Sequence, residues 1–284
     1  MDFVNFYAKL EIIRGCEFAK FFGISQRTIQ RWNKNGTKDL RKGAEKSVPR
    51  KLTQEESEEI YKVCCSARGK PEERIATAAN QVWMWDITWL KSPVTGMWYY
   101  AYVIIDLYDR SVINWAIYEN ESDEHSKQLF KDACRKHGCA PKFVHSDNGN
   151  PMKGVTLVGF FYQLGIVPSY SRPRVSDDNP FIESFFKTLK YTPGYPQHFN
   201  SIDHARKWLA DFVDWYNNCH WHSGMQYITP MQKRKGLHCQ IFASRNETLS
   251  NAKEKFPNRW GKRNTRKFIV KEQEILNPQV KKSA

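Results

Sequence analysis

The sequence predicts an α/β protein built on a mixed five-stranded sheet with helices on both faces. Three successive runs rich in β-branched and aromatic residues, 82–90, 97–105 and 112–118, are joined by short connections, which is typical of an antiparallel meander. Two shorter apolar runs, 143–145 and 166–170, then alternate with helical patterns. A meander followed by alternating helices and strands predicts a mixed sheet that is covered on both sides.

Turn-forming residues separate the first three predicted strands. Residues 93–96 contain Pro and Gly, and residues 108–110 contain Asp; these residue types favour tight turns. Asp106 and Asp109 flank the second turn. Acidic residues are ordinary at such positions, so we interpret both as turn residues.

Helices are expected at 122–137, at 157–164, from Asp178 onward and at 201–217. Pro180 suits the first turn of the third helix, where its missing N–H has no helical partner. The fourth segment is amphipathic, because its apolar residues recur at steps of three and four. These residues are Ala205, Trp208, Leu209, Phe212, Val213 and Tyr216.

The net charge of +14 is concentrated at the two ends of the chain. Residues 1–52 carry a net charge of +7 and residues 231–284 carry +10, whereas residues 53–230 carry −3. A single basic run is commonly only solvated surface. Two basic runs around a mildly acidic centre favour a catalytic body flanked by arms that bind a polyanion.

The sequence also predicts the cellular compartment. Seven cysteines in no paired pattern indicate a reducing environment. Cys134 and Cys139 flank His137, but no second cluster stands at zinc spacing, so we interpret them as helix-end residues. No apolar run approaches the ~20 residues of a membrane span, and no signal-peptide pattern is seen at the N-terminus. We therefore expect a soluble intracellular protein that contacts no membrane.

Residues 15–32 have the pattern of a helix-turn-helix, which leads us to assign a DNA-binding domain to residues 1–48. Gly23 interrupts one helical pattern and Ser25 can cap the next. The outer face of the second helix offers side chains that can reach base edges or phosphates. These side chains are Gln26, Arg27, Gln30 and Arg31. The alternative is an ordinary helical hairpin with a polar outer face.

The remaining chain divides into three segments by composition. Residues 49–80 are assigned to a linker with one short helix, opened by a capping-box pattern at 53–56 and followed by a polar connector at 67–80. Residues 81–236 form the predicted catalytic core. Residues 237–284 form a basic C-terminal segment in which we expect one short helix.

Three carboxylates are the candidate catalytic residues. Asp86 lies in the first strand, Asp147 follows the fourth strand, and Glu183 begins a helix; 60 residues separate the first two and 35 separate the last two. If the first and fourth strands are neighbours, Asp86 and Asp147 stand side by side. Crowded carboxylates repel one another unless a cation neutralises them, and magnesium prefers such oxygens. Two ions can then support an in-line phosphoryl transfer.

Residues near these carboxylates have less specific interpretations. Lys187 and Lys190 share the helical face of Glu183 and can hold DNA phosphates, or merely form weak surface ion pairs with it. Asn148 and Gly149 shape the turn after Asp147. Asn179 or Asp178 can cap the helix of Glu183. His145 and Ser146 lack the surroundings of a nucleophile elbow, so we set aside a nucleophilic pair.

These local sequences resemble those of bacterial insertion-sequence transposases whose catalytic core is like that of retroviral integrases. The resemblance covers about residues 81–236 and includes the 35-residue spacing. The matching motifs are Trp85-Asp86-Ile87-Thr88, His145-Ser146-Asp147-Asn148-Gly149, Ser171-Arg172-Pro173, Asp178-Asn179-Pro180-Phe181-Ile182-Glu183-Ser184, Lys190, Tyr216-Asn217, His222-Ser223-Gly224 and Thr229-Pro230.

The resemblance implies a ribonuclease H-like fold and an Asp-Asp-Glu catalytic triad formed by Asp86, Asp147 and Glu183. It also implies dependence on Mg²⁺ or Mn²⁺, hydrolysis of a DNA strand at the ends of a double-stranded element, and attack of the freed 3′-hydroxyl on a target DNA. The partners it implies are these DNA ends, the target and further copies of the chain in a homo-multimer. A bacterial cytoplasmic protein that associates with the nucleoid when bound to DNA is expected.

Two departures from the family pattern keep alternatives open. Only residues 53–80 occupy the place of a second helical DNA-binding segment, and Trp221 stands where relatives tend to have a basic residue. One alternative is a shortened, non-mobile derivative that binds DNA without completing transposition. Another is a retroelement or phage integrase, but no His/Cys zinc domain is seen before Gln81.

Overall fold

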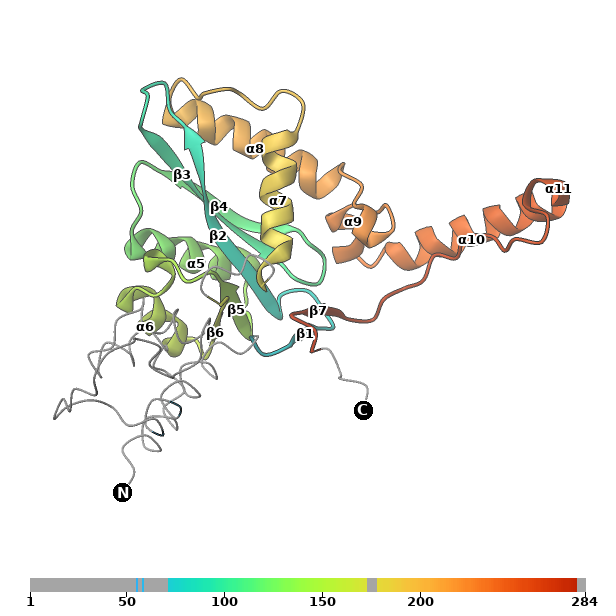
Figure 1. Ribbon diagram of the computed structural model, residues 1–284, viewed down its shortest axis with the longest axis horizontal. Helices are drawn as coiled ribbons and strands as arrows, with labels where there is room; N and C mark the ends of the chain where they lie inside the picture. Colours follow the sequence, from blue (N-terminus) through green and yellow to red (C-terminus); the bar gives the residue numbers. More distant parts are fainter. Residues whose placement is uncertain (1–54, 56–57, 59–70, 173–177, 280–284) are drawn as a thin grey trace, which may run out of the picture. The chain divides into compact units, whose positions relative to one another are not determined.

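The computed structural model describes residue 55, residue 58, and residues 71–172 and 178–279 (Figure 1). Residues 1–70 and 71–284 form two separate units, and the fold below is that of the second unit. The predicted helix-turn-helix lies outside the described residues. The assignments of Gln26, Arg27, Gln30 and Arg31 therefore remain predictions.

The predicted mixed five-stranded sheet is confirmed. Its strands stand in the order β4-β3-β2-β5-β6, with β2 antiparallel to β3 and parallel to β5. The strands are β2 (Val82–Lys91), β3 (Trp98–Asp106), β4 (Val112–Tyr118), β5 (Phe143–Ser146) and β6 (Val167–Tyr170). The antiparallel meander β2-β3-β4 matches the expectation. The short connections predicted it, because short turns can join antiparallel strands whereas parallel strands need crossovers.

Side chains of β2 alternate between two hydrophobic cores. Trp83 and Trp85 pack in the core that contains Leu129 and Phe130 of α5. Met84 and its neighbours on the other side pack in the core that contains α7 and α8. Successive strand residues point to opposite faces. Asp86, the residue after Trp85, therefore lies on the face that α7 covers.

The helices begin and end near the predicted positions. They are α5 (Asp123–His137), α6 (Val155–Gln163), α7 (Pro180–Tyr191) and α8 (Ile202–Asn218), with short 3₁₀ turns at η1 (Asn150–Met152) and η3 (Ser223–Met225). Ser122 and Ser201 cap α5 and α8 by accepting backbone N–H bonds, which satisfies donors that a helix start leaves unpaired.

The C-terminal part contains more regular structure than the sequence predicted. After α9 (Pro230–Arg234) comes α10 (His238–Lys255), an 18-residue helix and not a short one, followed by α11 (Pro257–Trp260). Only His238 and Phe242 of α10 are buried. A helix that buries so little of its surface has no apolar stripe, so its length could not be recognised from periodicity.

The chain returns to the core through a two-stranded sheet. The strand β7 (Glu274–Leu276) pairs antiparallel with β1 (Arg74–Ala76). The interpretation of residues 67–80 as only a polar connector is therefore wrong at β1. Ala76 and Leu276 are fully buried in the α7/α8 core, so this small sheet is part of the folded body. Among the described residues, no helix is both long and apolar enough to cross a membrane.

Candidate active site

Asp86 and Asp147 lie at corresponding positions of two neighbouring parallel strands. The register pairs Trp83 with Val144 and Met84 with His145. Asp86 and Asp147 each lie two residues beyond the last of these pairs. Both carboxylates therefore stand at the same end of the β2-β5 pair, as the sequence predicted, because parallel strands bring their carboxyl ends to one edge.

The backbone around each aspartate holds its carboxylate. The N–H of Ile87 donates to Asp86 Oδ1 at 2.7 Å, and the N–H of Gly149 donates to Asp147 Oδ1 at 2.9 Å. A Cβ on Gly149 would lie 3.2 Å from that same oxygen. Glycine thus leaves room for the tight turn that carries Asp147, as the sequence indicated.

Glu183 lies in the first turn of α7, and this helix packs on β2. Ile182, Phe185 and Leu189 are buried in the core shared with β2, while Glu183 is exposed. The helix is therefore fixed by its apolar side, and Glu183 is presented at its start. Pro180 stands at the first position of α7, where proline is well tolerated.

The electrostatics of Asp86 link the three carboxylates. Burial and the negative charges of Asp147 and Glu183 together raise the pKa of Asp86 to about 7, against the lowering effects of the Ile87 N–H and the Lys190 ammonium. Like charges disfavour one another's ionised forms only when they lie close together. The site therefore concentrates negative charge at one edge of the sheet.

Within residues 71–172 and 178–279, no three side chains of His, Cys, Asp or Glu converge closely enough to hold a metal ion together. The three carboxylates share a neighbourhood without meeting at one point. Their chemistry fits a divalent cation, because hard carboxylate oxygens are what Mg²⁺ binds and the repulsion on Asp86 is what a cation would relieve. Asp147 and Glu183 are exposed, so a cation can reach both from solvent.

The two predicted lysines stand differently at this site. Lys190 interacts electrostatically with Asp86: partial burial lowers the pKa of Lys190, and the charge of Asp86 opposes this. Lys187 lies four residues after Glu183, one helical turn further along α7, and is exposed. Lys190 thus belongs to the charge cluster, and Lys187 faces solvent beside it.

Sequence reasoning named His145 and Asn148 but missed the contacts through which they support the Asp147 loop. His145 is fully buried and lies 3.0 Å from Ser169 Oγ and 3.2 Å from Ser171 Oγ. Asn148 donates to the Ser171 carbonyl and accepts from the Lys153 ammonium. His145 is thus a packed, neutral side chain: burial lowers its pKa to about 4. Motif matching identified its position, but only the packing gives its role.

The expected side-chain capping bonds of α7 do not form. Asn179 occupies the cap position, but its side chain makes no capping hydrogen bond. Asp178 is fully buried and receives three bonds from Arg172: from the backbone N–H at 2.8 Å, and from Nε and a terminal guanidinium nitrogen at 2.9 Å each. Burial raises the pKa of Asp178, but these bonds and the charge of Arg172 lower it overall. The pair instead joins the end of β6 to the start of α7.

Asp106 and Asp109 do not compete for the catalytic role. Both are fully buried; Asp106 is the last residue of β3, and Asp109 lies in the turn that leads to β4. Asp106 accepts backbone N–H bonds from Tyr108 and Asp109, and Asp109 forms an ion pair with Arg234 at 2.9 Å. Their interpretation as turn residues is confirmed.

Comparison with known families agrees with this geometry. Two profiles described as integrase core domain match overlapping parts of the chain, residues 76–176 and residues 164–230. Together they span more than half of the chain and contain Asp86, Asp147 and Glu183. The chain belongs to the integrase core domain family.

The family members most similar in sequence include bacterial insertion-sequence proteins. The integrase core is 31% identical over 162 residues to the transposase for insertion sequence element IS904 of Lactococcus lactis, covering 56% of this chain and 63% of that protein. It is 29% identical over 163 residues to the transposase InsF for insertion sequence IS3A of Escherichia coli, covering 55% of this chain and 54% of that protein. The match thus spans less than two thirds of the length of either relative.

Two solved retroviral structures match parts of the chain at low sequence identity. A simian T-cell lymphotropic virus intasome chain matches 77% of this chain and 73% of its own length, with 17% identity and a TM-score of 0.47. The HTLV-2 integrase catalytic core domain in complex with magnesium matches 55% of this chain and 96% of its own length, with 18% identity and a TM-score of 0.41.

Proposed function

We propose that this chain is a DNA transposase that cleaves and joins DNA strands with Asp86, Asp147 and Glu183 as its catalytic triad. The observation that carries the proposal is the parallel register of β2 and β5 beside α7, since it gathers three carboxylates from distant parts of the sequence. The relatedness to insertion-sequence transposases supports the choice of DNA as substrate.

The three carboxylates would hold Mg²⁺ or Mn²⁺, and the proposal includes two ions. Bound metal supplies activation of the attacking oxygen and charge neutralisation at the leaving oxygen. The charges of Asp147 and Glu183 raise the pKa of Asp86, and bound cations would relieve this repulsion. The N–H of Gly149 keeps Asp147 in place, and the buried face of α7 fixes the start of the helix from which Glu183 extends.

The proposed substrates are the double-stranded ends of an insertion sequence and a target duplex, brought together by a homo-multimer of this chain. We infer that the reaction takes place on DNA in a bacterial cytoplasm, with nucleoid association while DNA is bound. The net charge of +14 supports binding to such a polyanion.

A strand-transfer assay tests the proposal. The full chain is mixed with short duplexes carrying the ends of its element and a labelled target duplex, with Mg²⁺, Mn²⁺ or EDTA. We expect joined products that require a divalent metal. DNA binding without any joining in either metal would overturn the proposed activity and favour a shortened, non-mobile derivative.

Lys187 gives a prediction about DNA contact. Replacing an exposed phosphate-binding lysine removes one released counterion, so Lys187→Gln should weaken binding of every DNA sequence to a similar extent. The slope of log affinity against log salt should fall by about 1. Fluorescence anisotropy at several salt concentrations measures both quantities. Lys131→Gln on α5 is the matched exposed control, and an unchanged slope in Lys187→Gln would exclude a phosphate contact.

A further inference from the structure

Residues 238–271, called the arm below, contain α10, α11 and a returning segment. The arm is anchored at its base, where Phe242 packs with Met225 and Ile228. Arg245 donates to the carbonyls of Gln226 and Tyr227 at 2.8 Å each. Figure 1 shows α10 leading away from the sheet, with α11 at its far end. The tip of the arm is therefore free of the core.

The returning segment is tied to α10. Asn246 exchanges two hydrogen bonds with the backbone of Phe268, at 2.9 and 2.8 Å. Gly261 makes the reversal possible with φ 55° and ψ −128°, a combination that side-chain-bearing residues rarely adopt. The arm is thus a defined hairpin-like element, and both ends of its chain are held at its base.

The tip carries positive charge without compensation from its own segment. Residues 256–271 contain six basic residues and no acidic residue, and all six basic residues are exposed. They are Arg259, Lys262, Arg263, Arg266, Lys267 and Lys271. Among the described residues, no carboxylate forms an ion pair with Arg259 or Arg263. A second identical arm would be repelled by this charge, whereas a polyanion would be attracted.

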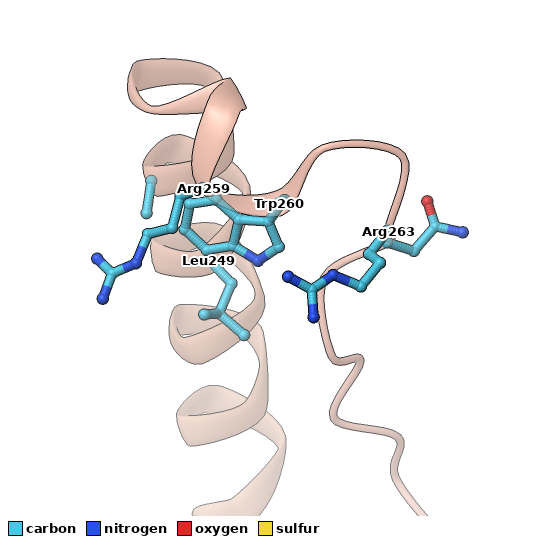
Figure 2. A pocket seen from close by; sticks show the side chains of 6 residues that line it. Leu249, Arg259, Trp260 and Arg263 are labelled. Atoms are coloured by element: carbon cyan, nitrogen blue, oxygen red, sulfur yellow. The ribbon is translucent and has the colours of Figure 1, made fainter.

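A hollow of about 520 Å³ lies at the tip, lined by Leu249, Ala252, Arg259, Trp260, Arg263 and Asn264. Figure 2 shows the Trp260 indole between the guanidinium groups of Arg259 and Arg263, with Leu249 beneath it. The Arg259 guanidinium carbon lies 5.7 Å from the centre of the Trp260 ring. A partly exposed aromatic face between two cations can accept a flat base and its flanking phosphates.

We propose that the tip of the arm binds single-stranded DNA, with a base stacked on Trp260 and phosphates held by Arg259 and Arg263. Duplex DNA would use the charges alone, because its bases are stacked on each other. The inference rests on the proposed function, in which strand cleavage exposes unpaired ends. It adds a DNA contact that is separate from the three carboxylates.

Fluorescence anisotropy of the full chain with a labelled oligothymidine of about 12 nucleotides and with a matched duplex tests this inference. We expect Trp260→Ala to weaken binding to the single strand about 10-fold and to leave duplex binding nearly unchanged, since one stacked base contributes roughly 1–3 kcal/mol. Trp260→Phe should retain most of the affinity. Arg263→Gln should weaken binding to both DNA forms.

Matched controls separate the tip from the rest of the surface. Trp89→Ala removes an exposed tryptophan of β2, and Arg135→Gln removes an exposed arginine of α5; neither should affect the single strand as the tip variants do. Equal single-strand affinity in Trp260→Ala and the parent chain would overturn the proposal. An equal loss for single strand and duplex would also overturn it, leaving only a general charge effect.

Photocrosslinking locates the contact without any substitution. An oligonucleotide that carries 5-iodouracil is irradiated with the full chain, and the product is digested after glutamate. The inference predicts a crosslink in the peptide 255–272, which contains Trp260; crosslinks confined to other peptides would contradict it. Failure of strand transfer with an intact Trp260 crosslink would remove the proposed activity but keep this binding site.

Discussion

Asp86→Asn, Asp147→Asn and Glu183→Gln are each expected to reduce strand transfer about 1000-fold or more while leaving DNA binding in place. Each change removes one negative charge from a cluster that would neutralise and orient divalent metal. Loss of metal-based stabilisation of the transition state costs several kcal/mol, and about 4 kcal/mol corresponds to a factor of 1000 in rate. The measurement is single-turnover joining in Mg²⁺ and in Mn²⁺, beside anisotropy with the same duplex.

The exposed carboxylate of Asp211 on α8 provides the matched control. Asp211→Asn should join DNA as fast as the parent chain. Retained joining in any one of the three triad variants would remove that residue from the catalytic site.

Asp86→Asn should also make the metal-free protein more stable. A stable but inactive variant would show that the loss of strand transfer comes from lost chemistry and not from unfolding. The folded-state pKa of Asp86, about 7, lies above its ordinary value of 3.8. Ionised Asp86 therefore costs folding free energy, and its contribution to stability falls as the pH rises from about 4 to about 7. At pH 8 in EDTA, thermal unfolding should show a higher midpoint for Asp86→Asn. A lower midpoint would contradict the crowding of the three carboxylates.

The second large effect is expected from Glu274→Gln, which should lower the free energy of unfolding by about 3–5 kcal/mol. Glu274 in β7 pairs with Arg110 at 3.0 Å and with Lys233 at 2.8 Å, and all three side chains are nearly buried. The glutamine keeps the shape but leaves two buried cations without a counter-charge. Urea unfolding followed by circular dichroism measures the loss.

The same change is expected to reach the active site through Arg110. The Arg110 guanidinium lies 3.4 Å from the centre of the Phe181 ring, in the first turn of α7, two residues before Glu183. Glu274→Gln should therefore also slow strand transfer under conditions where the variant remains folded. Glu272→Gln, at an exposed position of the same segment, should change neither property. Full stability in Glu274→Gln would show that the ion pairs add nothing to the fold.

Local sequence predicted the sheet because its strands have strong local patterns. The run from Val82 alternates between two apolar faces, and Ser122 and Ser201 mark helix starts. These features depend on neighbours within a few residues, so they can be read without the fold. The spacing of Asp86, Asp147 and Glu183 likewise identified a candidate triad from the sequence and its resemblance alone.

Local sequence did not predict the contacts that close the fold. The strand β1 has only three residues and is paired by β7, about 200 residues later in the chain. A three-residue strand has too few side chains to show alternation, so only its partner reveals it. The cap expected at Asp178 failed for a related reason, because Arg172 offered Asp178 a stronger, charged partner.

The sequence by itself predicted the five strands of the central sheet, the helices between residues 122 and 217, the three candidate carboxylates and the basic C-terminal segment. The tertiary structure decided that Asp86 and Asp147 share one sheet edge, that Lys190 joins their charge cluster, and that Trp260 lies in a hollow between two arginines. The physical reason is distance along the chain. Periodicity and turn chemistry act over a few residues, whereas repulsion, ion pairing and burial depend on which distant segments the fold brings together.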